Sequence, residues 1–277
     1  MSTSLAVELV GVTKRYPRVV ANEDATLDVR TGEIHAIVGE NGAGKSTLMK
    51  MLAGVTRPDA GTIRVRGRAL VKHTPEEAAQ AGVGMVFQHF VLVPTLSVAE
   101  NVVLGREPRR GPWLDRAAAA EEVRALSATL GMDVDPTAEV GRLPIGVQQR
   151  VEILKVLARR AEVLILDEPT AILTPQEVDD LLAVLRRLAA EGKTIVLVTH
   201  KLREVMAVAD RVTVLRHGRT VATLAAHDTT ADAIAELMVG RPPRPLTRPE
   251  AREPGEAGNT MSEEALDRVE RSGASFR

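Results

Sequence analysis

The stretch Gly39-Glu40-Asn41-Gly42-Ala43-Gly44-Lys45-Ser46-Thr47 fits the pattern G-x-x-x-x-G-K-[ST]. A predicted strand, 33–38, precedes it, and Leu48, Met49 and Leu52 follow it at helical spacing. A strand, a glycine-rich loop and a helix in this order bring backbone N–H groups together around phosphate oxygens. The stretch 39–47 therefore predicts a phosphate-binding loop.

Each residue type in this loop has a chemical reason. Gly39, Gly42 and Gly44 allow backbone conformations that other residues avoid, so that successive N–H groups point inward. Lys45 is expected to neutralise β- and γ-phosphates, and the Ser46 hydroxyl to ligate Mg²⁺. The alternative is a glycine-rich turn with an incidental lysine, which the flanking strand and helix argue against.

Short β-branched runs alternate with longer stretches of helical spacing. Continuous apolar strands between helices are typical of a parallel sheet covered on both faces, so the predicted class is α/β. The expected strands of this sheet are 34–38, 84–87, 163–166, 194–199 and 211–215.

Three other regions have a different pattern. The runs 7–12, 21–29 and 62–65 predict a smaller, more antiparallel region, and about 90–160 predicts a helical insertion. From Arg241 onward, prolines fall among alternating charges, which predicts a flexible tail over 241–277. We expect one domain over 5–240.

Composition limits the possible functions. The 277 residues carry 36 Lys+Arg against 37 Asp+Glu, a formal net charge of -1, which gives no general electrostatic reason to bind nucleic acid. There is no cysteine, so thiolate catalysis and Cys-ligated zinc are excluded. The first residues lack the pattern of a signal peptide, and no apolar run suggests a spanning helix. Any membrane function therefore requires another chain to cross the bilayer.

A second chemical element is the apolar strand 164–166 followed by Asp167 and Glu168. Two adjacent carboxylates at the end of a buried strand are costly for packing, but they suit the surroundings of a magnesium ion. Asp167 is expected to hold Mg²⁺ through water, and Glu168 to polarise the water that attacks a γ-phosphate. Alternatively, the pair caps the helix that follows Thr174 and Pro175.

With both elements present, the chain resembles ATP-binding-cassette (ABC) ATPases over about 5–240. The resemblance implies a P-loop NTPase (RecA-like) parallel core with an antiparallel β subdomain and a helical signature subdomain, and ATP with Mg²⁺ as ligands. It makes Gln88 the glutamine that reaches the metal and the attacking water, His200 the switch histidine, and Tyr16 the aromatic that stacks on adenine. Taken singly, such a His is more often structural and such a Gln is usually polar surface, whereas the Tyr is about equally a core residue.

The resemblance also assigns a signature segment that contacts the ATP of a second cassette. It consists of Leu143, Pro144, Ile145, Gly146, Val147 and Gln148. The family usually has Leu-Ser-Gly-Gly-Gln here, and Pro144 supplies neither a hydroxyl nor an N–H group. Slow hydrolysis at that composite site, or use of Gly146 and its neighbouring amides, is expected. Thr174 stands where the family has Asp, which puts communication between the two sites in doubt.

Longer segments, 87–101, 167–177 and 200–205, are similar to cassettes that energise the import of simple sugars and nucleosides. Those resemble two tandem copies, whereas this chain resembles a single half. The implied partners are a second cassette, identical or different, transmembrane permease subunits and, indirectly, a substrate-binding protein, without nucleic acid. The implied location is peripheral, on the cytoplasmic face of the cell membrane. A permease loop is expected in a groove lined by 88–101, unless Val91, Leu92, Val93 and Leu96 are simply core.

Two alternatives remain at this level. One is a poorly catalytic or regulatory cassette subunit, which Pro144 suggests. The other is a soluble ABC ATPase that acts on ribosomes or DNA, although only about one hundred residues separate Lys45 from Gly146, too few for a long coiled-coil arm. The cargo and the direction of transport are left open.

Overall fold

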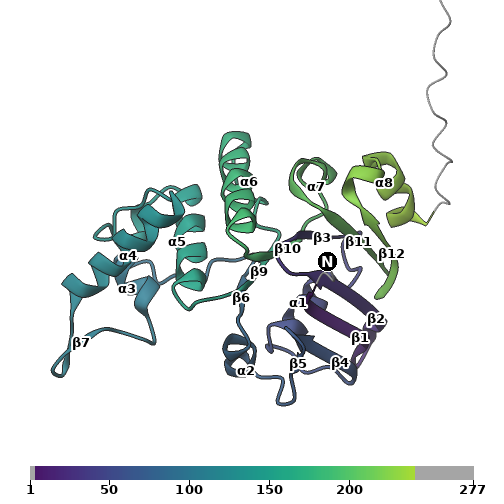
Figure 1. Cartoon of the computed structure of the whole chain (residues 1–277), viewed down its shortest axis with the longest axis horizontal. Coiled ribbons are helices and arrows are strands. Elements are labelled where there is room, and N and C mark those ends of the chain that lie inside the picture. The colour runs from purple at the N-terminus through teal and green to yellow at the C-terminus, as the bar shows by residue number, and fades with distance from the viewer. Residues whose placement is uncertain (1–3, 241–277) are drawn as a thin grey trace, which may run out of the picture. The chain divides into compact units, whose positions relative to one another are not determined.

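The computed structural model describes residues 4–240 (Figure 1). Within this part the chain forms a central six-stranded sheet, a four-stranded antiparallel sheet and a set of helices. The predicted tail over 241–277 lies outside the described residues, and the expected domain boundary near Gly240 stays a prediction. No described helix has both the length and the apolar character needed to cross a membrane.

The central sheet has the strand order β12-β11-β3-β10-β9-β6. Its strands run parallel except for β12, which pairs antiparallel with β11. The parallel class predicted from the apolar runs is confirmed. In chain order, the strands are β3 (Ile34–Val38), β6 (Val83–Val86), β9 (Val163–Asp167), β10 (Thr194–Val198), β11 (Arg211–Arg216) and β12 (Arg219–Ala225).

Every residue of β3, β9 and β10 is buried, because helices or sheet cover both faces. Alternate side chains enter different cores: Val163 and Ile165 pack toward α1 (Lys45–Leu52), whereas Leu164 and Leu166 pack toward α6 (Pro175–Ala190). The period of two along a strand produces this division. Continuous apolar strands therefore hold the sheet between two hydrophobic layers.

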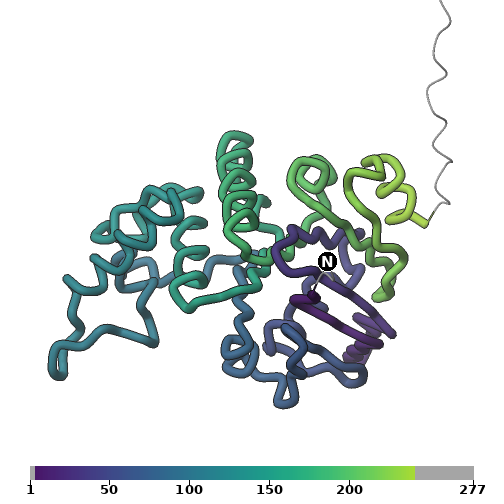
Figure 2. Tube along the Cα trace, viewed as in Figure 1, coloured from purple at the N-terminus to yellow at the C-terminus, as the bar shows by residue number. Residues whose placement is uncertain are grey.

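The antiparallel sheet has the order β2-β1-β4-β5. The predicted small antiparallel region is confirmed, and it shares its core with α1. Figure 2 shows these N-terminal strands beside the C-terminal β12, and the Thr220 hydroxyl donates to the Thr26 carbonyl at 2.7 Å. The strands are β1 (Leu5–Tyr16), β2 (Val19–Arg30), β4 (Ala60–Val65) and β5 (Arg68–Ala69).

A helical block extends to one side of the central sheet (Figure 1). Its first helix begins with a capping box in which Ser97 and Glu100 satisfy each other's backbone N–H groups. Its elements are α3 (Val98–Val103), the hairpin β7 (Arg109–Arg110) and β8 (Trp113–Leu114), α4 (Arg116–Leu130), a 3-10 turn (Val140–Arg142) and α5 (Ile145–Leu157).

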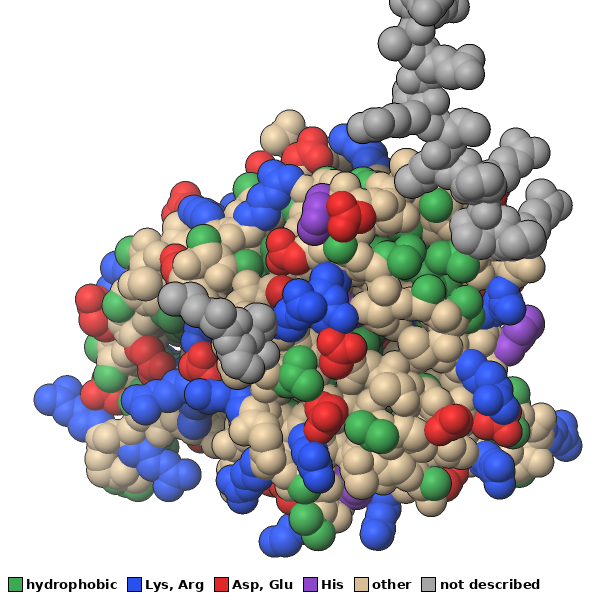
Figure 3. All heavy atoms as spheres, turned by 45° about the vertical axis from the view of Figure 1, so that its right-hand side comes forward, with side chains coloured by type: hydrophobic (Ala, Val, Ile, Leu, Met, Phe, Trp, Pro, Cys, Tyr) green, Lys and Arg blue, Asp and Glu red, His purple; other side chains and the backbone are tan. Residues whose placement is uncertain are grey.

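The remaining helices cover the central sheet or its connections. Figure 3 shows basic and acidic side chains interspersed over one face of the molecule, so this face does not carry a single sign of charge. The helices are α2 (Pro75–Gln80), α7 (Leu202–Val208) and α8 (Ala231–Val239), with a 3-10 turn at Ala226–Asp228.

Most predicted strands and helices are present with ends shifted by a few residues. The strand predicted at 84–87 begins and ends one residue earlier, and the predicted 7–12 extends to Tyr16. The sequence reading missed β12 and the β7–β8 hairpin. Edge strands with polar, partly exposed residues lack the continuous apolar run on which the prediction depended.

Candidate nucleotide site

The carboxyl ends of three neighbouring parallel strands meet around one pocket. Strand β3 leads into the phosphate loop, β9 ends at Asp167 and β10 is followed by His200. The pocket between them has a volume of about 460 Å³. Its lining contains many predicted residues together with three that the sequence did not indicate, Val19, Ala21 and Ala171. The predicted lining residues are Asn41, Gly42, Ala43, Gly44, Lys45, Ser46, Thr47, Gln88, Glu168 and His200.

Gly44 shows why the loop needs glycine. Its φ is +98°, and a Cβ atom there would lie 2.3 Å from the carbonyl oxygen of Ala21. Gly44 is also the residue from which α1 begins, so the close approach to β2 fixes the direction of that helix. The N–H groups of the first turn of α1 are thereby presented to the pocket.

Lys45 is buried, with 6% of its surface exposed, and its Nζ folds back onto the loop. It donates to the carbonyl oxygen of Gly39 at 2.7 Å and to that of Glu40 at 3.1 Å. Burial lowers the pKa of Lys45, and the negative charges of Glu168 and Asp167 oppose this shift. The Lys45 ammonium is held by two backbone carbonyls and lies near two carboxylates. In this position it is suited to donate to phosphate oxygens.

Asp167 ends β9 on the face that packs toward α1, so its carboxylate reaches the start of that helix. The Ser46 hydroxyl donates to Asp167 Oδ1 at 3.0 Å. Burial raises the pKa of Asp167, the Ser46 hydrogen bond lowers it, and the nearby Glu168 raises it further. A hydroxyl and a carboxylate oxygen side by side form a donor set that fits Mg²⁺, which prefers oxygen ligands and retains waters. Among the described residues no group of three His, Cys, Asp or Glu side chains forms an all-protein metal cage.

Glu168 and His200 form a pair across the pocket. The distance from His200 Nδ1 to Glu168 Oε1 is 2.9 Å, and half of the His200 side chain is exposed. Glu168 has a φ of +50°, a left-handed conformation that is uncommon for a residue other than glycine. Its N–H donates to the Val198 carbonyl at 2.9 Å, which ties the two strand ends together. Strained backbone of this kind clusters at functional sites.

Gln88 and Tyr16 lie differently with respect to the pocket. Gln88 is an exposed residue after β6 and lines the pocket. Tyr16 ends β1, is 43% exposed and is not among the lining residues. It pairs with Val19, which does line the pocket, and Lys14 Nζ lies 5.6 Å from the ring centre. Stacking of Tyr16 on adenine stays a prediction.

The signature residues do not line this pocket. Pro144 is the N-cap of α5. The Gly146 N–H donates to Glu177 Oε1 at 3.2 Å, and a Cβ atom on Gly146 would lie 2.5 Å from that oxygen. Glu177 belongs to α6, so a carboxylate of the same chain already engages the amide expected to bind a second cassette's nucleotide.

Thr174 has a structural role that the sequence reading gave to other residues. Its hydroxyl accepts from the Glu177 N–H, and the Glu177 carboxylate accepts from the Thr174 N–H at 2.9 Å, which completes a capping box for α6. The alternative that Asp167 and Glu168 cap this helix is therefore wrong. The T-x-x-E pattern at 174–177 was the signal that could have shown it.

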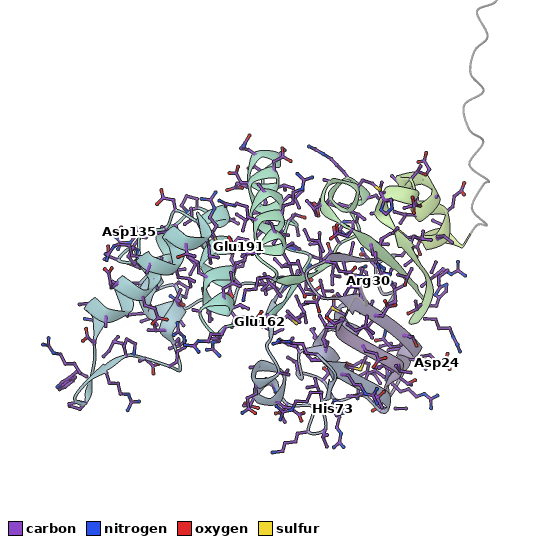
Figure 4. The ribbon with its side chains drawn as sticks, viewed as in Figure 1. Asp24, Arg30, His73, Asp135, Glu162 and Glu191 are labelled. Carbon is purple, nitrogen blue, oxygen red and sulfur yellow. The ribbon has the colours of Figure 1, made fainter. Side chains whose placement is uncertain are left out.

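A groove of about 260 Å³ lies between α5 and the segment around α2 and β6. Figure 4 labels Glu162 near it, and the neighbouring Ala161 lines it. Of the four apolar residues expected here, Val91 lines the groove and is 57% exposed, whereas Leu92 packs on the core. Glu152 and Lys155 of α5 bind the Val91 N–H and C=O, each at 2.6 Å. Burial raises the pKa of Glu152.

Comparison with known proteins agrees with this geometry. The family described as "ABC transporter" matches residues 22–171, more than half of the chain, including the phosphate loop and both acidic residues. The chain belongs to the ABC transporter family. The α/β fold with an antiparallel sheet and a helical block, which the resemblance implied, is that of an ABC cassette.

Curated relatives in this family are import proteins. The chain is 46% identical over 254 residues to the nucleoside import ATP-binding protein NupA of Lactococcus lactis subsp. cremoris, covering 92% of this chain and 50% of NupA. It is 48% identical over 235 residues to the ribose import ATP-binding protein RbsA 3 of Rubrobacter xylanophilus, covering 85% of this chain and 48% of that relative. The chain thus spans about half the length of these relatives.

Solved structures support the fold. A nucleotide-free ATP-binding cassette from an ABC transporter superposes with a TM-score of 0.75 at 22% identity, covering 86% of this chain and 96% of that one. A dimeric ATP-binding cassette bound to ADP and Pi superposes with a TM-score of 0.68 at 25% identity, covering 79% and 98% of the two chains.

Proposed function

We propose that this cassette binds ATP with Mg²⁺ and hydrolyses it to energise an ABC importer of simple sugars or nucleosides. One observation carries the proposal: the Lys45 loop and the Glu168–His200 pair line one pocket at three adjacent strand ends. Asp167 accepts a hydrogen bond from Ser46 of that lining. Cargo class rests on the names of relatives, which include both nucleoside and ribose import proteins.

The phosphate loop and its lysine bind the nucleotide. Lys45 Nζ exchanges its contacts with the Gly39 and Glu40 carbonyls for β- and γ-phosphate oxygens, and the first-turn amides of α1 point at the same anion. Ser46, by its hydroxyl, and Asp167, through water, would hold Mg²⁺. When bound, the metal neutralises charge on the phosphates during their separation.

Glu168 is the proposed base. Its carboxylate accepts a proton from the water that attacks the γ-phosphate, and His200 holds the carboxylate in place through the 2.9 Å contact. Gln88 lines the same pocket and orients the water or metal. The reaction forms a bond from the water oxygen to the γ-phosphorus and releases ADP as leaving group.

Energy transfer requires partners, and these are part of the proposal. We propose that the cassette pairs with a second cassette, identical or different, and attaches to transmembrane permease subunits that are served by a substrate-binding protein. The groove lined by Val91 is the proposed seat of a permease loop on the cytoplasmic face of the membrane. The dimeric cassette among the similar structures supports the pairing.

A poorly catalytic or regulatory cassette is the second candidate. Pro144 donates no hydrogen bond, and the Gly146 amide is engaged by Glu177. A composite site built with this helix has fewer free donors for the partner's γ-phosphate, and one missing donor typically costs about 3–4 kcal/mol of transition-state stabilisation.

Phosphate release separates the two candidates. Glu168→Gln should retain ATP affinity and lose about 10²–10⁴-fold in turnover, because only the base is removed. Glu191→Gln, at the exposed C-terminal end of α6, is the matched control and should turn over normally. Turnover that is unchanged in Glu168→Gln removes this residue from the mechanism. A wild-type chain that releases no phosphate, alone or with co-expressed membrane proteins, favours the regulatory candidate.

A further inference from the structure

A buried carboxylate bonds to two threonines that lie close in sequence to Glu168 and His200, and no role of its own was predicted for its residue from the sequence. Glu204, in the first turn of α7, has 3% of its surface exposed. Its Oε1 accepts from the Thr170 hydroxyl at 2.6 Å, and its Oε2 accepts from the Thr199 hydroxyl at 3.0 Å. Thr170 follows Glu168 by two residues, and Thr199 directly precedes His200.

Lys201 fixes the direction of both hydrogen bonds. Its Nζ donates to the Thr170 hydroxyl at 3.3 Å, and its N–H donates to the Thr199 hydroxyl at 3.0 Å. Each threonine hydroxyl thus accepts from Lys201 and donates its single proton to Glu204. The Glu204 carboxylate therefore acts as acceptor at both oxygens, and Lys201 Nζ lies 3.5 Å from Oε1.

The two threonines are buried, with 1% and 0% of their surfaces exposed, so water does not replace these bonds. Thr199 is bonded directly to His200, and one residue, Pro169, separates Thr170 from Glu168. Glu168 also has the left-handed φ of +50°, which persists only where its surroundings enforce it. The hydrogen bond from the Glu168 N–H to the Val198 carbonyl holds the backbone at Glu168 itself. The bond from Thr170 to Glu204 holds the chain two residues later.

We propose that Glu204 is a positioning residue that holds Glu168 and His200 in register by clamping the loops after β9 and β10. This inference rests on the proposed function, since it assigns no contact with nucleotide to Glu204 itself. The clamp sets the position of the base and of its histidine. It therefore affects the rate of hydrolysis and leaves the affinity for ATP unchanged.

The test uses Thr199→Val, which removes a hydroxyl at nearly constant volume, and Glu204→Gln, which keeps the side-chain shape. Both should lower kcat of the full chain by about tenfold to a hundredfold, because small misplacements of reacting groups cost rates of this order. KM and the Kd for ATP should stay within about twofold of wild type, since the phosphate loop is untouched. Thr199→Ser restores the hydroxyl and should restore kcat.

Thr213→Val is the matched control. Thr213 is a fully buried threonine whose hydroxyl bonds His35 Nε2 at 2.7 Å, on β11 and away from Glu204. It should lower stability while leaving kcat near wild type. The inference is overturned if Thr213→Val loses as much kcat as Thr199→Val does. It is also overturned if Thr199→Val and Glu204→Gln both keep a normal kcat.

Two further measurements separate this inference from the proposed function. In a Glu168→Gln background, Thr199→Val should cause no additional loss of turnover, because the clamp acts through Glu168. If the two substitutions together lower turnover by the product of their separate effects, the inference is contradicted. If the wild-type chain releases no phosphate, the proposed hydrolytic function fails. Hydrogen exchange still decides on the clamp: the Glu168 amide should exchange faster in Thr199→Val than in Thr213→Val, and equal rates overturn the inference.

Discussion

At the scale of single residues, Gly44 combines an unusual φ with a close neighbour. Gly44→Ala should destabilise the protein by about 1–2 kcal/mol from the left-handed backbone and by about 1–3 kcal/mol more from contact with Ala21. Gly32→Ala is the control, because Gly32 has a φ of +77° and open space around its Cβ position. In urea unfolding, Gly32→Ala should show only the backbone cost of about 1–2 kcal/mol, because no neighbouring atom contacts its Cβ. Equal losses would contradict the assigned contact.

Glu33 gives a pH prediction. Burial raises its pKa, but hydrogen bonds from His35 and Arg30 and the charge of Arg211 outweigh burial, and the pKa lies below the usual 4.5. Between pH 4.5 and the lowered pKa, Glu33 is protonated more often in the unfolded chain than in the folded protein. Glu33 therefore stabilises the fold above pH 4.5, and this contribution is lost as the pH falls through the lowered pKa.

The corresponding variant is Glu33→Gln. It should be less stable than wild type by about 1–3 kcal/mol at pH 7, with the difference shrinking below pH 4.5 as wild-type Glu33 is protonated. Glu121→Gln, on the exposed side of α4, should change stability by less than about 0.5 kcal/mol. Urea unfolding at several pH values checks both, and a difference that is constant with pH rejects the assignment.

At the scale of elements, Thr174 decides how α6 begins. Thr174→Ala should cost about 1 kcal/mol because a side-chain acceptor for the Glu177 N–H is lost. Thr174→Asp should cost less than about 0.5 kcal/mol, since Asp is an equally good N-cap. Thr230→Ala, which removes the corresponding cap of α8, is a control with a similar expected loss. Thermal unfolding compares them, and a large loss in Thr174→Asp contradicts the capping role.

Elements with strong local signals could be predicted from the sequence. The buried strands β3, β9 and β10 are continuous apolar runs, and the phosphate loop has a fixed spacing between strand and helix. The edge strand β12 mixes polar and apolar residues and pairs in the sheet only with β11, so it lacks the continuous apolar run of the buried strands.

Contacts between distant segments explain what the sequence could not reveal. The Glu177–Gly146 bond joins residues 31 positions apart, and the Glu204–Thr170 bond joins residues 34 positions apart. No periodicity predicts which buried carboxylate meets which hydroxyl, because the meeting depends on how α5, α6 and α7 pack. The pocket residues Val19 and Ala21 were missed for the same reason, since β2 reaches the loop only in the folded chain.

At the scale of the whole molecule, the proposed function requires two cassettes. Glu168→Gln with ATP should form a dimer with twice the 29.8 kDa mass of the chain, because ATP held without hydrolysis keeps both composite sites closed. Light scattering after size-exclusion chromatography measures this mass. ADP in place of ATP is the control and should leave monomers. A monomer under both conditions indicates that a different cassette is the partner.

The central claim is that the loop 39–47 wraps the phosphates of a nucleotide. Titration of the full chain with labelled ATP and Mg²⁺ tests it, with Lys45→Ala as the variant and Lys193→Ala, whose side chain pairs with Glu162 at 3.0 Å, as the control. Saturable binding by wild type and Lys193→Ala, with affinity at least about tenfold weaker in Lys45→Ala, is predicted from loss of a charge-assisted phosphate contact. No binding by wild type at millimolar ATP, or equal affinity in Lys45→Ala, contradicts the claim.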